Sequence, residues 1–135
     1  MTDARCLCGE TGLKVGSVAD TFNACHCDMC KKWGGIWVAV ECKNVELQGR
    51  DNIGVYNSSD FAERGFCKLC GTHLYYKIKD HISYFVPVGL FSTDTAFTFL
   101  RQIFFDRKPD YYSFANETEK MTEEETFKWF RGADT

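Results

Sequence analysis

The sequence is short of proline, of positive charge and of long apolar runs. It has 2 prolines in 135 residues and a formal net charge of −3. No apolar run approaches the roughly 20 residues that a membrane span needs, so we expect no membrane partner. The acidic balance argues against nucleic-acid binding through a basic surface. The first five residues contain no apolar leader segment, so we predict a cytoplasmic protein.

The composition is that of a globular protein. Hydrophobic residues make up 44% of the chain and charged residues 26%, which excludes disorder of the whole chain. A chain of 135 residues can bury a sizeable core and favours one domain over two. We therefore predict a single domain over residues 1–135.

Short segments rich in β-branched and aromatic residues predict a mainly β fold. Turn-forming residues or cysteine bound each segment. The expected strands are Leu13–Val18, Ile36–Glu41, Val45–Gln48, Ile53–Tyr56, His73–Ile78, Ile82–Val86 and Phe97–Phe105. Phe97–Phe105 also fits a helix, because its alternation is imperfect.

One short helix is expected near the C-terminus. Thr122 is followed three residues later by Glu125, which is the spacing of a capping box. Acidic residues fill the turn after Thr122, as the helix dipole favours. We predict a helix over Glu123–Phe130, with Phe127 and Phe130 facing the core.

Cysteine is abundant, with eight in the chain, and seven of them fall in three clusters. Without a secretory leader disulfides are disfavoured, so clustered cysteines indicate metal ligands or catalytic thiols. A Cys-x-x-Cys turn followed by glycine brings two thiolates to one ion, and thiolates favour zinc over magnesium or calcium. A redox-active Cys-x-x-Cys pair and a set of buried free thiols are the alternatives. The clusters are Cys6-Leu7-Cys8-Gly9, Cys25-His26-Cys27-Asp28-Met29-Cys30 and Cys67-Lys68-Leu69-Cys70-Gly71.

The number of thiols bears on function. Seven thiolates cannot fill two four-ligand sites, so we expect a split of four and three, with the middle cluster placing three on one ion. A four-thiolate site is closed and structural, whereas three ligands leave a position for substrate or water. The eighth cysteine, Cys42, follows the apolar run Ile36–Val40 and Glu41, so a buried free thiol is the simpler interpretation. As a fourth ligand, Cys42 would make both metals structural.

These motifs resemble the GFA family, which is named for a glutathione-dependent formaldehyde-activating enzyme and includes a centromere-protein-V branch. The resemblance runs from about residue 4 to residue 130. The basic extension of some centromeric relatives is missing here, so the resemblance gives no support for a chromatin role. The matching segments are Cys-x-Cys-Gly, Cys-His-Cys-x-x-Cys-Lys-Lys-Trp-Gly-Gly, Arg64-Gly65-Phe66-Cys67-x-x-Cys70-Gly71-Thr72 and Ile103-Phe104-Phe105-Asp106-Arg107-Lys108-Pro109-Asp110-Tyr111-Tyr112.

The resemblance implies a β-tent fold, in which small antiparallel sheets are pinned by two zinc ions per chain. It implies a carbon–sulfur lyase, similar to S-(hydroxymethyl)glutathione synthase, with a small thiol such as glutathione and a small aldehyde as partners. A noncatalytic zinc-stabilised binding module and a labile-zinc thiol sensor are the alternatives. The resemblance places Cys6, Cys8, Cys67 and Cys70 on a structural zinc and Cys25, Cys27 and Cys30 on a catalytic zinc.

Other polar residues lie beside the middle cluster. His26 sits between two expected ligands, and because neighbours alternate in direction we expect it to point away from the metal. A proton shuttle and a ligand are the alternatives for His26. Lys31 and Lys32 face solvent, balance the charge of an anionic thiolate site or bind a substrate carboxylate. Tyr111, in the last matching segment, is expected to pack near the pocket, with catalysis as the alternative.

Overall fold

The computed structural model describes residues 1–133, which form nine strands and two α-helices. Two compact units divide the chain: Met1–Asp20 with Ala39–Phe97, and Thr21–Val38 with Thr98–Thr135. Two long strands, β2 (Gly12–Cys25) and β3 (Trp37–Gln48), each pass from one unit into the other. The single domain over residues 1–135 stays a prediction.

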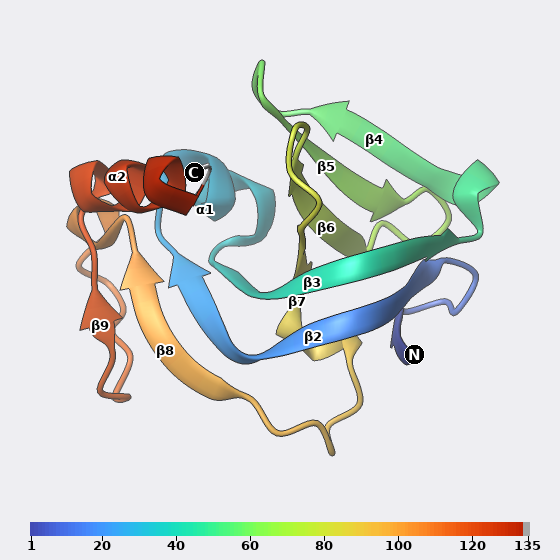
Figure 1. Cartoon of the computed structure of the whole chain (residues 1–135), viewed down its shortest axis with the longest axis horizontal. Coiled ribbons are helices and arrows are strands. Elements are labelled where there is room, and N and C mark those ends of the chain that lie inside the picture. The colour runs from blue at the N-terminus through green and yellow to red at the C-terminus, as the bar shows by residue number, and fades with distance from the viewer. Residues whose placement is uncertain (134–135) are drawn as a thin grey trace. The chain divides into compact units, whose positions relative to one another are not determined.

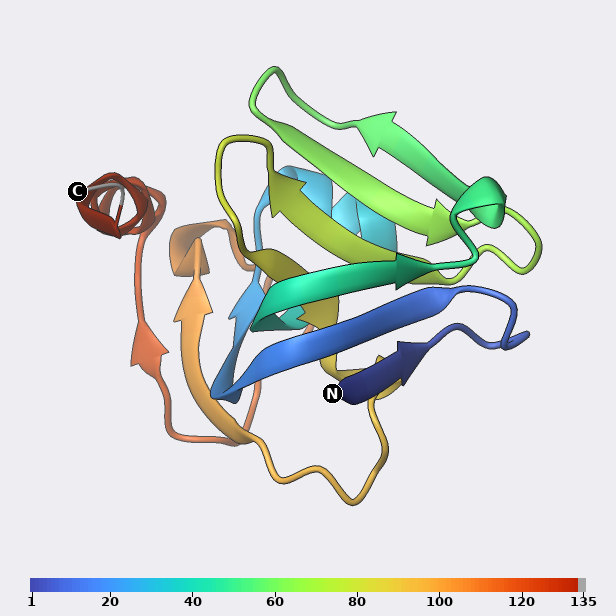
Figure 2. The same cartoon turned by 45° about the vertical axis from the view of Figure 1, so that its right-hand side comes forward.

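The first unit is built from antiparallel strand pairs. Its strands run in the order β4-β5-β6-β7-β3, and β3 neighbours β2 (Figures 1 and 2). The pairs β4–β5, β5–β6, β6–β7 and β3–β7 are all antiparallel, as is the pair of β1 with the start of β2. The remaining strands are β1 (Thr2–Arg5), β4 (Ile53–Asn57), β5 (Ala62–Cys67), β6 (His73–Ile78) and β7 (Tyr84–Pro87).

Alternating apolar side chains make the core of this unit. Leu13 and Val15, two residues apart on β2, are fully buried, and Leu13 lies opposite the buried Ala4 of β1. This alternation fixes the register of β1 against β2, because a shift by one residue would turn the buried side chains to the other face. Elsewhere in the unit one close approach requires glycine: a Cβ at Gly65 would lie 2.1 Å from the ring of Tyr75 on β6.

The second unit adds parallel pairs. The end of β2 pairs in parallel with β8 (Thr98–Ile103), and β8 pairs in parallel with β9 (Glu119–Lys120). The mainly β class is confirmed, but the sheet is mixed where only antiparallel pairs were expected. The unit also holds the helices α1 (Asp28–Gly34) and α2 (Glu123–Ala133). Short 3-10 turns lie at Arg50–Asn52, Val88–Leu90 and Phe105–Arg107.

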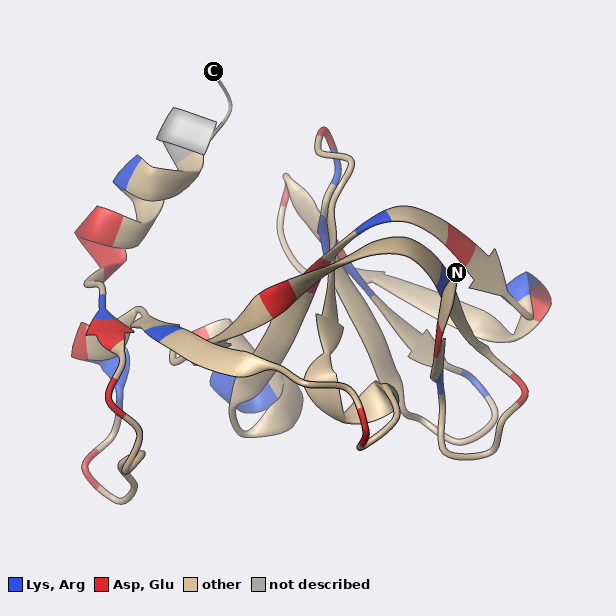
Figure 3. Ribbon diagram, turned by 60° about the horizontal axis from the view of Figure 1, so that its bottom comes forward, with Lys and Arg blue, Asp and Glu red and all other residues tan. Residues whose placement is uncertain are grey.

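The C-terminal helix α2 begins as its capping box predicts. The Glu125 backbone N–H donates to the Thr122 hydroxyl at 3.1 Å, and the Thr122 N–H donates to Glu125 Oε1 at 2.9 Å. Acidic residues mark its first turn in Figure 3. Among residues 123–130, Thr126 is buried and Phe130 is half-buried, whereas Phe127 is 44% exposed with its ring against Phe104, so the inward position expected for Phe127 was wrong.

Most of the expected strands are present, some with different bounds. His73–Ile78 is β6 without change, and Phe97–Phe105 contains the strand β8 and no helix. Ile36–Glu41 and Val45–Gln48 join into the single strand β3. None of the helices in residues 1–133 has the length and apolar character to cross a membrane.

Candidate metal centres

The first candidate centre joins two distant parts of the sequence. Four thiols come together with all their Sγ atoms within 4.8 Å of one another. We call them the four-cysteine group: Cys6, Cys8, Cys67 and Cys70. Tetrahedral coordination with metal–sulfur bonds of about 2.3 Å separates sulfurs by about 3.8 Å. The Sγ atom of Cys8 lies 3.6 Å from that of Cys6 and 3.9 Å from that of Cys67, so these sulfurs fit tetrahedral coordination of one metal ion.

Two backbone turns of the same design present these thiols. Cys6 and Cys67 each donate their N–H to the carbonyl of a threonine five residues later, Thr11 at 3.1 Å and Thr72 at 2.8 Å. The glycine of each turn donates back to the carbonyl of its first cysteine and has a positive φ, 83° for Gly9 and 80° for Gly71. Glycine adopts this left-handed conformation without strain, which explains its place after each cysteine pair.

The second candidate centre is local. Cys25 ends β2, Cys27 caps α1, and Cys30 lies within that helix. Their Sγ atoms also lie within 4.8 Å of one another, and we call them the three-cysteine group. The Cys30 N–H donates to the Cys27 sulfur at 3.4 Å, so the first turn of the helix folds the loop around its own thiols. Cys25 and Cys30 are buried.

The close packing of the thiols makes both groups suited to hold a cation. Hydrogen bonding to Cys27 and Cys30, together with burial, raises the pKa of Cys25 well above its usual value. Three thiolates packed so closely repel one another, and a bound cation offsets that repulsion. In the four-cysteine group, the hydroxyl and backbone N–H of Thr72 lower the pKa of Cys70 to about 5. Each group therefore brings together sulfur donors that could hold a metal ion.

His26 points into a buried hydrogen-bond chain. Its side chain is fully buried, with Nε2 2.8 Å from Gln102 Oε1 and Nδ1 2.5 Å from the Tyr112 hydroxyl. Its backbone N–H donates to the Ile103 carbonyl at 3.1 Å. Burial lowers the pKa of His26, and the positive charges of Lys108 and Lys31 add to this shift. The side chain of His26, which lies between two cysteines in the sequence, is thus held by hydrogen bonds to Gln102 and Tyr112.

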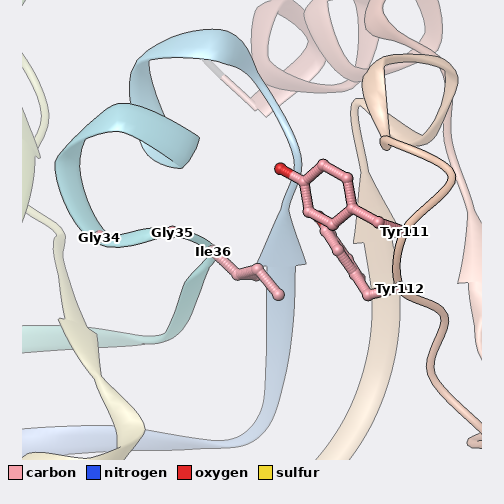
Figure 4. Close-up of a pocket in the computed structure, with 5 residues that line it drawn as sticks. All are labelled: Gly34, Gly35, Ile36, Tyr111 and Tyr112. Atoms are coloured by element: carbon pink, nitrogen blue, oxygen red, sulfur yellow. The ribbon is translucent and has the colours of Figure 1, made fainter.

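An open pocket of about 500 Å³ lies at the C-terminal end of α1. Gly34, Gly35 and Ile36 line one side, and Tyr111 and Tyr112 line the other. Figure 4 shows both tyrosine side chains projecting toward the segment that carries Ile36. Tyr111 was expected near a pocket and lies there, whereas Tyr112 was not singled out from the sequence.

Two lysine side chains near the three-cysteine group donate to backbone carbonyls. Lys31 Nζ donates to the Arg107 carbonyl at 2.8 Å and lies 3.2 Å from Asp28 Oδ1. Lys108 Nζ donates to the Tyr112 carbonyl. Because these contacts hold the two ammonium groups beside the His26 segment, they add positive charge near the three-cysteine group.

Cys42 behaves as a core thiol. It is fully buried on β3, and its thiol donates to the Val40 carbonyl at 3.7 Å. Burial raises the pKa of Cys42 to about 12, which keeps the thiol protonated. Within residues 1–133, Cys42 belongs to neither cysteine group.

Three comparisons relate the chain to known proteins. A protein of Schizosaccharomyces pombe, named as an uncharacterized lyase, is 37% identical over 129 residues, which cover 93% of this chain and 94% of that protein. The crystal structure of a Rhodobacter sphaeroides protein matches with a TM-score of 0.57 and 22% identity, over 67% of this chain and 88% of that one, and shows a shared fold. The family model described as glutathione-dependent formaldehyde-activating enzyme matches residues 1–107. With its cysteine clusters gathered into two groups, the chain belongs to this family, the GFA family.

Proposed function

We propose that the protein is a zinc-dependent carbon–sulfur lyase or synthase that acts on thiol adducts of small aldehydes. Its partners would be a small thiol such as glutathione and an aldehyde such as formaldehyde, in the reducing cytoplasm. The observation that carries the proposal is the unequal number of thiols in the two groups, four in one and three in the other. The family membership and the lyase name of the Schizosaccharomyces pombe relative support the reaction class.

The cysteines divide into two roles in this proposal. The four-cysteine group would enclose a structural zinc, because four thiolates complete a tetrahedral site. The three-cysteine group would hold a second zinc, which supplies one open position that keeps a substrate thiol in its thiolate form at neutral pH. In the reaction, the thiol sulfur bonds to the aldehyde carbon and the thiol proton ends on the aldehyde oxygen, giving a hemithioacetal; the lyase direction reverses both changes.

The surrounding residues of this chain would orient and shield the reactants. Cys25 and Cys30 are buried, which excludes water from that side of the centre. The pocket walls of Ile36 and Tyr112 would hold the part of the adduct that does not react. Lys31 and Lys108 would offset the negative charge that three thiolates and a fourth sulfur bring together.

The test combines metal analysis with a screen of thiols against aldehydes. We expect two zinc ions per wild-type chain and turnover that depends on both a thiol and an aldehyde. Cys30→Ala should lose one zinc and at least about 100-fold in kcat/KM, because the second site loses a ligand. Cys42→Ala is the matched control, since it removes a buried thiol from neither group, and should keep two zinc ions and its activity.

Two results would overturn the proposal. Full activity after Cys30→Ala would show that the three-cysteine group does not carry the reaction. Two tightly bound zinc ions without turnover of any thiol–aldehyde pair would favour a noncatalytic zinc-stabilised module instead.

A further inference from the structure

The hydrogen-bond chain through His26 has a fixed direction. Gln102 Nε2 donates to the Thr118 hydroxyl at 2.9 Å, which turns Gln102 Oε1 toward His26. A carbonyl oxygen only accepts, so His26 donates from Nε2. His26 Nδ1 is then the acceptor in the neutral ring, and the Tyr112 hydroxyl is the donor at 2.5 Å.

This chain of hydrogen bonds connects one wall of the pocket to the loop that carries Cys25 and Cys27. His26 is flanked by Cys25 and Cys27, and its ring is fully buried, so moving the ring moves the backbone that carries both thiols. At the other end, the ring of Tyr112 lines the pocket beside Ile36. Gln102 lies on β8 opposite Ala24 of β2, so this end of the hydrogen-bond chain is anchored in the sheet.

We propose that Tyr112 is a positioning residue of the three-cysteine group: its hydroxyl, through His26, holds the loop of Cys25 and Cys27 in register with the pocket. This inference rests on the proposed function for its kinetic consequence. Its structural part is independent, because it concerns how firmly the loop holds its three thiols.

The decisive variant is Tyr112→Phe, which keeps the ring in the pocket wall and removes only the hydroxyl. The measurement is the alkylation rate of each cysteine by iodoacetamide in the zinc-loaded protein, read by peptide mass spectrometry. We expect alkylation of Cys25, Cys27 and Cys30 to accelerate about tenfold, the usual scale for losing a partner beyond the ligands themselves. The four-cysteine group should react at the wild-type rate, whereas general destabilisation would expose both groups.

A second variant breaks the same chain of hydrogen bonds at its Gln102 end. Gln102→Leu removes the acceptor that fixes the His26 tautomer and should accelerate alkylation of the same three thiols. Tyr75→Phe is the matched control, because Tyr75 is a 2% exposed phenol of the first unit. It should leave the rates of the three-cysteine group unchanged.

Kinetics give a separate readout. In Tyr112→Phe we expect KM for the substrate thiol to rise about tenfold, with a smaller change in kcat, because the loop no longer holds the three-cysteine group firmly in its binding geometry. Wild-type alkylation rates in Tyr112→Phe would overturn the inference even if the enzyme turns over thiol and aldehyde. Accelerated alkylation in a protein without turnover would overturn the proposed function and leave the positioning role standing.

Discussion

At the scale of single residues, Thr11 and Thr72 occupy the same place in the two turns of the four-cysteine group but bond differently. The Thr72 hydroxyl accepts from the Leu7 N–H at 3.1 Å and lies 3.1 Å from the Cys70 sulfur. It thereby connects one cysteine turn to the other. The Thr11 hydroxyl makes no such bridge: it is buried on the Cys6 side, where, against the effect of burial, the side chain and backbone N–H of Thr11 lower the pKa of Cys6 to about 7.

The difference predicts unequal effects of the same substitution. Thr72→Val removes both contacts of the hydroxyl while keeping the shape of the side chain, and should weaken zinc binding at the four-cysteine group about tenfold. Thr11→Val removes a hydroxyl that interacts with Cys6 alone and should weaken zinc binding less than Thr72→Val does. Competition with a chromophoric chelator measures both. Equal affinities of the two variants would contradict the role given to Thr72.

At the scale of secondary structure, the sequence predicts an element well where its pattern is local. A short segment rich in aromatic and β-branched residues predicts β6 to the residue, and the capping box predicts the start of α2. The three-cysteine group is predicted because all its members lie within six residues. Each of these signals is contained in the segment that it describes.

The sequence fails where distant residues decide the structure. Strand β5 contains Glu63-Arg64-Gly65, which does not alternate like a strand, yet Arg64 is 3% exposed with its guanidinium over the ring of Tyr76 on β6. Helix α1 has seven residues and its N-cap is a cysteine, so the sequence lacks the usual N-cap residue that would predict a helix there. Gln102 and Tyr112 are 76 and 86 residues from His26, and only the fold brings them to it.

Helix α2 offers a test at this scale. Thr122→Ala removes the hydroxyl that accepts from the Glu125 N–H and should lower the free energy of unfolding by about 1 kcal/mol. The exposed Glu124 pairs with Lys128 at 3.2 Å, so Glu124→Ala should cost at most about 0.5 kcal/mol. Urea denaturation followed by circular dichroism compares them. A cost for Thr122→Ala no larger than for Glu124→Ala would show that the cap does not stabilise the helix.

At the scale of the whole molecule, the two cysteine groups close loops of very different length. Cys8 and Cys67, whose sulfurs lie 3.9 Å apart, are separated by 59 positions in the sequence. The three-cysteine group spans residues 25–30 alone. Cross-linking the longer loop lowers the conformational entropy of the unfolded chain and so raises its free energy by about 4 kcal/mol. Cross-linking the shorter loop raises that free energy by about 2 kcal/mol. A metal on the four-cysteine group therefore contributes more to folding.

Loss of one ligand from each group tests this division. Cys67→Ala should lower the free energy of unfolding about 2 kcal/mol more than Cys27→Ala, although each removes one zinc ligand in our proposal. Cys67 is fully buried, so part of its cost is a cavity, and the equally buried Cys42→Ala measures that part. Chelator should bring wild type toward the stability of Cys67→Ala. Equal losses for Cys67→Ala and Cys27→Ala, after subtraction of the Cys42→Ala cost, would leave no basis for one structural and one catalytic metal.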